Sequence, residues 1–294
     1  MSEETETPRA KQVALLRTVL QNRIAPDALA WIDAARAKVA VADEPRTLYM
    51  AFSAAGRRTG KEPLKPTPDE RAAAGAGRAD WDLSSWTVDQ AARVLLLLEL
   101  RAESGDALTA RLDPLFQSAD LGELQALCKS LPLLPFPEAH RARCADIVRT
   151  NITSVFEAVA HENPYPTEQL DEGAWNQMVL KALFIGVKLY PIQGIDERAN
   201  PELARILCDY AHERWAAGRK ISPELWRCVG PFADDGMLAD LERAVSDDDG
   251  PGALGALLAL KTCPHDGAAP LREAAPLPAG LLADGDWKHL GDLQ

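Results

Sequence analysis

The chain has 294 residues, of which 47% are hydrophobic and 26% are charged. This composition is typical of soluble globular proteins and excludes the collagen-like, disordered and disulfide-scaffold classes. Asp and Glu (44) outnumber Lys and Arg (32), so the formal net charge is −12. Because an acidic surface repels phosphate backbones, we expect no nucleic-acid partner.

The cysteines and the N-terminal stretch indicate the cellular compartment. The cysteine count is odd and no pair has C-x-x-C spacing, so we expect isolated, buried thiols in a reducing environment. Residues 1–9 are acidic and lack the basic and apolar regions of a secretory signal. The apolar run Val94–Leu98 is far shorter than the roughly 20 residues that span a bilayer. The sequence therefore predicts a cytoplasmic protein without membrane insertion.

Apolar residues recur at three- and four-residue spacing through the first half of the chain, which predicts helices. These helices are expected to begin near Gln12, Pro26, Glu44, Ser85 or Thr87, Asp106 and Asp120. A long loop containing a short helix is expected over 56–77, where glycine, proline and basic residues gather. Two prolines make Leu131–Pro135 a connector, because proline blocks helix continuation.

Helices also dominate the second half of the chain. A long helix is predicted over 137–161, followed by a polar loop over 163–173. Further helices are predicted over 174–186, 201–217, 223–230, 237–245 and 252–262. The tail from Pro264 is rich in Pro, Ala and Gly and is expected to be irregular.

No alternating segment predicts a β-strand, so the expected fold is all-α. Short helices with short links must stack to bury their apolar faces, which favours a right-handed, HEAT-like α-solenoid of antiparallel helical hairpins. We expect a disordered tail over 1–10, an N-terminal helical part over 11–135, a helical hub with HEAT-like C-terminal helices over 136–262, and an irregular tail over 263–294. The two helical parts are expected to form one continuous domain.

Motifs of established enzymes are absent from the sequence. Gly56–Lys61 differs from a phosphate loop because three residues, not four, separate its glycines and Glu62 follows the lysine. The two His-Glu pairs, at His161 and His212, lack the second histidine of a zinc protease. Neither a nucleophile elbow nor a dinucleotide fingerprint occurs. We therefore predict no catalytic residue, no cofactor and no metal site.

Polar positions on otherwise apolar helices are the candidate ligand-binding residues. Glu157 and His161 lie one turn apart on one predicted helix, and Gln177 and Lys181 have the same spacing on another. The second helix is apolar around most of its circumference, which predicts burial. A buried Lys181 needs an acidic partner, which Glu157 or Asp209 could supply. The alternative is a set of separate surface contacts, with the lysine amine reaching solvent.

Three further residues complete this candidate site. The helix predicted from Pro201 carries Asp209 and His212 opposite its apolar stripe, and Arg198 lies in the loop before it. A surface ion pair beside an imidazole is the alternative. A polar cleft lined by Glu157, His161, Gln177, Lys181 and Asp209 would be the default binding site of the hub.

Four stretches of this region carry a family resemblance. Arg149–Pro166 (RTNITSVFEAVAHENPYP), Ala174–Gly186 (AWNQMVLKALFIG), Ala199–Arg219 (ANPELARILCDYAHERWAAGR) and Ser222–Phe232 (SPELWRCVGPF) resemble the EboA family. Weaker similarity covers Arg46–Leu64 and Leu131–Pro135. EboA proteins accompany a bacterial gene cluster associated with making or moving a small metabolite. The resemblance thus implies a pathway, whose other proteins include a prenyltransferase-like membrane protein and a TatD-like hydrolase, but it carries over no catalytic residue.

Three functions are compatible with these observations. The leading hypothesis is a non-enzymatic helical binding or scaffold protein in an Ebo-type pathway of small-metabolite biosynthesis or trafficking, in secondary metabolism. The second is an enzyme acting on a small anionic metabolite, with Glu157 and His161 as an acid–base pair and Lys181 or Arg198 holding the anion. The third is a docking module for the cluster's enzymes, which would present an exposed apolar patch. The expected partners are a small metabolite and other Ebo-cluster proteins.

Overall fold

A computed structural model of the chain describes residues 7–246, 250–274 and 286–293. The described residues form helices joined by short links and contain no β-strand, which confirms the all-α prediction. An isolated antiparallel bridge pairs Pro63 with Thr87. No helix in these ranges is long and apolar enough to cross a membrane. The chain divides into two compact units, Met1–Leu170 and Asp171–Gln294, called unit 1 and unit 2 below.

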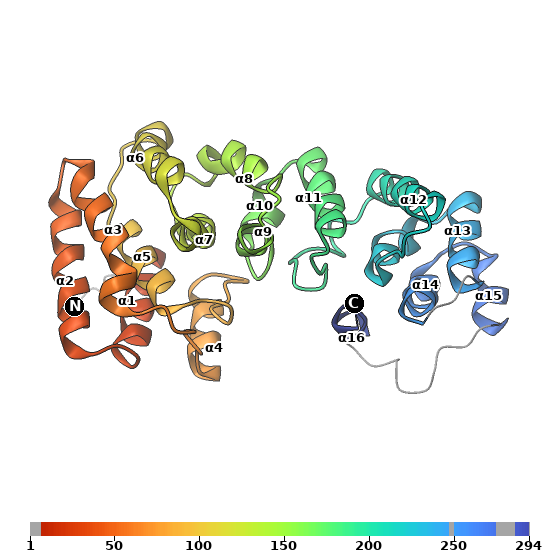
Figure 1. Cartoon of the computed structure of the whole chain (residues 1–294), viewed down its shortest axis with the longest axis horizontal. Helices are drawn as coiled ribbons and strands as arrows, with labels where there is room; N and C mark the ends of the chain where they lie inside the picture. The colour runs from red at the N-terminus through yellow and green to blue at the C-terminus, as the bar shows by residue number, and fades with distance from the viewer. Residues whose placement is uncertain (1–6, 247–249, 275–285, 294) are drawn as a thin grey trace, which may run out of the picture. The chain divides into compact units, whose positions relative to one another are not determined.

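The helices of unit 1 follow one another with few residues between them (Figure 1). They are α1 (Pro8–Gln21), α2 (Pro26–Val41), α3 (Pro45–Thr59), α4 (Pro68–Gly77), α5 (Val88–Leu97), α6 (Gly105–Ser118), α7 (Leu121–Ser130), the 3-10 helices η1 (Leu131–Leu133) and η2 (Pro137–His140), α8 (Arg141–Ile147), α9 (Thr153–Ala160) and α10 (Tyr165–Gln169). Of the predicted disordered tail, residues 1–6 lie outside the described residues.

Local signals fix several helix starts in unit 1. Proline occupies the first turn of α1, α2, α3 and α4, where its missing N–H costs no helical hydrogen bond. Thr87, one of two predicted caps, is the N-cap of α5. Asp120 caps α7 by accepting a hydrogen bond from the Glu123 N–H, and Glu123 accepts one from the Asp120 N–H.

Helix α5 is the centre of unit 1. Every residue from Val88 to Leu97 is buried, because α5 packs against α1, α2, α3 and α7. Its polar residues Asp89, Gln90 and Arg93 are therefore inside the unit. Arg93 forms an ion pair with Asp89 and donates a hydrogen bond to the Phe52 carbonyl on α3 (3.1 Å). A fully buried helix thus carries a paired charge network.

The prediction of one long helix over 137–161 is wrong. The segment forms η2, α8 and α9, with an interruption between Ile147 and Thr153. At the interruption the Thr150 hydroxyl accepts a hydrogen bond from the Ile152 N–H (3.1 Å). Threonine and asparagine side chains compete with the helical hydrogen-bond ladder in this way, and the Thr150–Asn151 pair ends the helix.

Unit 2 contains the remaining described helices. They are α11 (Glu172–Ile185), α12 (Pro201–Ala216), the 3-10 helices η3 (Pro223–Cys228) and η4 (Gly230–Phe232), α13 (Asp235–Ser246), α14 (Pro251–Thr262), α15 (Ala268–Ala274) and α16 (Asp286–Asp292). Asp171 and Asn200 cap α11 and α12 by accepting hydrogen bonds from the N–H groups of Ala174 and Leu203, both at 2.8 Å.

Helix α14 is the centre of unit 2 and packs against α13 and η3. Gly255 permits the close approach, because a Cβ at this position would overlap the backbone of Pro223. The predicted helix over 223–230 is thus present as 3-10 turns against α14. The tail from Pro264, expected to be irregular, includes α15 and α16. Leu290 on α16 is fully buried, which explains why this short helix is held in place.

Candidate functional site

Two of the seven predicted binding residues belong to unit 1. Glu157 is exposed on α9, and His161 is the half-buried C-cap residue of the same helix. His161 is therefore at the end of α9, where its N–H donates to the Glu157 carbonyl (2.8 Å). This backbone hydrogen bond confirms that Glu157 and His161 lie one helical turn apart.

Gln177 and Lys181 lie on α11 in unit 2. Trp175, Met178 and Val179 on this helix are buried, as its apolar circumference predicts. Gln177 is exposed and Lys181 is half-buried. The Lys181 amine lies 5.3 Å from the ring centroid of Phe184, whose own exposure is 66%. Lys181 thus packs beside an exposed aromatic ring.

Arg198, Asp209 and His212 make separate contacts elsewhere in unit 2. The Arg198 guanidinium lies 4.6 Å from the centroid of the buried Trp175 ring, and partial burial lowers its pKa. Asp209 forms an exposed ion pair with Arg205 (2.7 Å). His212 Nε2 lies 2.7 Å from the Asp240 carboxylate on α13. The cleft expected to be lined by Glu157, His161, Gln177, Lys181 and Asp209 stays a prediction.

The buried thiol of Cys208, next to Asp209 in the sequence, is unreactive. Cys208 is one turn before His212 on α12. Burial and the neighbouring Asp240 carboxylate raise the pKa of Cys208 to about 12. The thiol is therefore protonated at neutral pH, and a nucleophilic Cys–His pair is not formed. Among the described residues, no group of three or more His, Cys, Asp or Glu side chains is placed to hold a metal ion.

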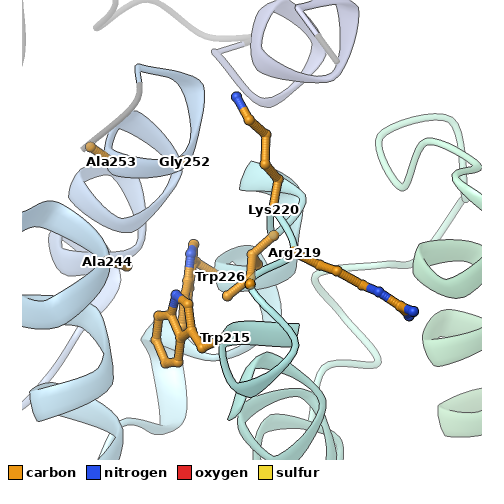
Figure 2. A pocket seen from close by; sticks show the side chains of 9 residues that line it. Trp215, Arg219, Lys220, Trp226, Ala244, Gly252 and Ala253 are labelled. Atoms are coloured by element: carbon orange, nitrogen blue, oxygen red, sulfur yellow. The ribbon is translucent and has the colours of Figure 1, made fainter. Parts of the chain in front are cut away.

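A cavity of about 370 Å³ lies within unit 2. Its lining comes from the end of α12, the following loop, η3, α13 and the start of α14 (Figure 2). The lining residues are Trp215, Gly218, Arg219, Lys220, Ile221, Trp226, Ala244, Gly252 and Ala253. His212 is linked to this cavity because its ring stacks on Trp215 (centroids 5.9 Å apart).

The cavity has an aromatic wall. The rings of Trp215 and Trp226 are tilted against each other with centroids 5.8 Å apart. Trp226 is 1% exposed, whereas Trp215 is half-buried. The Arg243 guanidinium on α13 lies 4.1 Å from the Trp215 centroid and fixes that ring further. Large, rigid side chains thus form one side of the cavity.

Small residues and a tight turn leave the space open. Gly218 has φ +61°, a left-handed conformation that glycine adopts without strain, and it turns the chain at the end of α12. The Arg214 guanidinium then holds the loop by donating two hydrogen bonds to the Lys220 carbonyl (2.9 and 2.6 Å). Opposite the indoles, Ala244, Gly252 and Ala253 carry little or no side chain.

Sequence reasoning did not single out this cavity. Trp215 and Trp226 are visible in the sequence as aromatic residues of the hub, but their separation from Ala244 and Gly252 along the chain gives no sign of a shared space. A sequence feature that could have indicated the cavity is Gly218, a turn residue between Trp215 and Trp226.

The family model described as metabolite traffic protein EboA matches residues 12–230. The chain belongs to the EboA family. The matched range contains the EboA stretches quoted above up to Gly230, and it includes Trp215, the 218–221 loop and Trp226. Ala244, Gly252 and Ala253, on the opposite side of the cavity, lie beyond it. Neither the curated proteins nor the solved structures yielded a significant match to the chain.

Proposed function

We propose that this EboA protein is a non-enzymatic binding protein that holds a small metabolite in the cavity of unit 2. The observation that carries the proposal is a cavity of about 370 Å³ with the indoles of Trp215 and Trp226 in its wall. Small-molecule sites have volumes of about 300–1,000 Å³ and are lined mainly by apolar and aromatic groups with few polar ones. The family description, metabolite traffic, agrees with such a role.

The chemistry of the lining favours binding over catalysis. Among the described residues that line the cavity, none has a carboxylate, imidazole, hydroxyl or thiol side chain, and Lys220 is the one whose side chain can transfer a proton or act as a nucleophile. An acid–base pair or a nucleophile with its activating base needs at least two such groups within hydrogen-bond reach of the substrate. A carrier or scaffold role in the pathway needs only selective, reversible contact.

The finer expectations on fold and setting are part of the same proposal. Consecutive helices pack as pairs in both units, α2 with α3 and α13 with α14, which supports HEAT-like hairpins as the building blocks. The five cysteines are buried and unpaired by disulfides, which supports a reducing cytoplasmic location. Other Ebo-cluster proteins are the proposed partners.

The experiment is a fluorescence titration of the whole protein with 8-anilinonaphthalene-1-sulfonate, an aromatic probe that fits such a cavity. Ala244→Leu places a side chain in the cavity without deleting any core group, and Ala239→Leu makes the same change at an exposed position of α13. We expect Ala244→Leu to weaken probe binding by about tenfold, as for loss of about 1.4 kcal/mol. Equal binding by the two variants would reject the cavity as the site.

A further inference from the structure

We propose that His212 is a positioning residue of this cavity, because its ring, held by Asp240, fixes the Trp215 indole that forms part of the wall. This inference rests on the proposed function, since it assumes that the cavity of unit 2 binds a small molecule. It adds a residue outside the cavity lining that controls how well the wall is ordered. The argument uses the contacts between α12, which carries His212 and Trp215, and α13, which carries Asp240.

The contact with the cavity wall is made along α12. His212 and Trp215 lie three residues apart, so their side chains leave the same face of the helix. Their rings stack with centroids 5.9 Å apart and planes inclined by 28°. His212 is not one of the described residues that line the cavity. Its effect on a ligand would therefore pass through the indole.

Helix α13 holds the imidazole in place. His212 Nε2 lies 2.7 Å from the Asp240 carboxylate, and because a carboxylate accepts hydrogen bonds, Nε2 donates. The Asp240 side chain is only 15% exposed, and the Cys208 thiol, one turn before His212 on α12, also hydrogen-bonds to it. A fixed acceptor at this position restricts rotation of the imidazole, so the ring stays against Trp215.

A second contact between the same helices acts on the indole directly. Arg243 lies three residues after Asp240 on α13, and its guanidinium is 4.1 Å from the Trp215 ring centroid. Two residues of α13 thus contact two residues of α12 at the same three-residue spacing. Ala244, which follows Arg243, lines the cavity together with Trp215. The register that these contacts set between α12 and α13 therefore also sets the space between Trp215 and Ala244.

An ordered wall favours binding because the ligand does not have to order it. Immobilising a side chain at a binding site costs free energy, and a site that is already ordered avoids this cost. Trp215 is half-buried, so part of its ring has no surrounding core to hold it. The imidazole stack and the Arg243 contact supply that support before the ligand arrives. Removing the His212 ring should thus weaken binding, although His212 is outside the cavity.

The first test is a titration of the whole protein and its variants with 8-anilinonaphthalene-1-sulfonate. His265→Ala is the matched control for His212→Ala, because His265 Nε2 also lies against an aspartate of α13 (Asp235, 2.9 Å), and no stack on a cavity ring is found for it among the described residues. We expect His212→Ala to bind the probe about fivefold more weakly, within the effect of one aromatic pair, and His265→Ala to bind as wild type. His212→Phe keeps a ring for the stack and should bind within about twofold of wild type. The His212 side chain is 53% exposed, so these variants are expected to stay folded.

The second test reads the indole itself, by fluorine NMR of the whole protein labelled with 5-fluorotryptophan. The Trp215 signal is assigned by its loss in Trp215→Phe. His212→Ala should shift or broaden this signal, whereas His265→Ala should leave it unchanged. A general loss of stability would not single out one of the seven tryptophans in this way.

Wild-type affinity of His212→Ala for the probe would overturn the inference, as would an unchanged Trp215 signal in that variant or equal losses in His212→Ala and His265→Ala. Ala244→Leu distinguishes this failure from failure of the proposed function. If Ala244→Leu weakens probe binding and His212→Ala does not, the cavity is the site but His212 does not position its wall. If Ala244→Leu has no effect, the cavity is not the site and both proposals fail.

Discussion

Asp89→Asn is expected to destabilise unit 1 through the charge that it leaves behind. Asp89 and Arg93 are 4% and 2% exposed and form an ion pair one turn apart on α5. Asparagine has nearly the same shape and can still accept the hydrogen bond from the Thr87 hydroxyl (2.6 Å). The substitution therefore removes the negative charge and little packing. Leaving one member of a buried pair uncompensated costs about 3–5 kcal/mol.

The lower end of this range applies here because a second carboxylate is near. Glu123 on α7 lies 3.9 Å from the Arg93 guanidinium and partly compensates its charge. We therefore expect a loss of about 3 kcal/mol in the free energy of unfolding for Asp89→Asn. Asp43→Asn, at an exposed position, should stay within about 0.5 kcal/mol of wild type.

The assay is urea unfolding followed by far-ultraviolet circular dichroism, with a double-mutant cycle. Adding Arg93→Met to Asp89→Asn removes the unpaired cation, so the double variant should lose at least about 1 kcal/mol less than the sum of the single losses. A loss below about 1 kcal/mol for Asp89→Asn, or strict additivity in the cycle, would refute the role of the pair as a buried, mutually compensating charge system.

Three more substitutions test other parts of the fold. Burial lowers the pKa of Lys129 to about 8, so between about pH 8 and pH 10.5 the unfolded state binds more protons than the folded state. The stability of wild type relative to Lys129→Met should thus rise by about 3 kcal/mol over this interval in urea titrations at stepped pH, and a flat difference would contradict it. Trp175→Ala should cost about 3–5 kcal/mol, because the ring is fully buried under Arg198; an unchanged melting temperature would show otherwise. Gly255→Ala should cost more than about 1 kcal/mol by forcing α14 away from Pro223, whereas Gly75→Ala, where a Cβ meets no atom within 4 Å, should be neutral or stabilising in the same thermal scan.

Helix positions were predictable where neighbouring residues determine them. Pro26 marks the first turn of α2, Asp120 the cap of α7, and the apolar circumference of α11 predicts its burial. These features depend on hydrogen bonds and spacing within one turn or one helix. The interruption near Thr150 was missed because a threonine hydroxyl can face solvent or its own backbone, and spacing alone does not distinguish the two.

Which charged residues are buried, and where a cavity forms, depends on contacts that the sequence does not show. Arg93 and Lys129 are typical surface residues, and only the packing of α3, α5 and α7 places them inside. The cavity wall of Ala244 and Gly252 is defined by missing side chains, which leave no pattern along the chain. The pattern of polar residues on amphipathic helices predicted Asp209 and His212 as binding residues. The cavity is lined instead by Trp215, the aromatic neighbour of His212.

The central claim, that the cavity of unit 2 holds a small molecule, is tested most directly by a crystal structure of the whole protein grown with 8-anilinonaphthalene-1-sulfonate. The account predicts the naphthalene ring of the probe inside this cavity, against Trp215 and Trp226. Density for the probe only at other surfaces, with the space between the indoles and Ala244 vacant or closed, would contradict it.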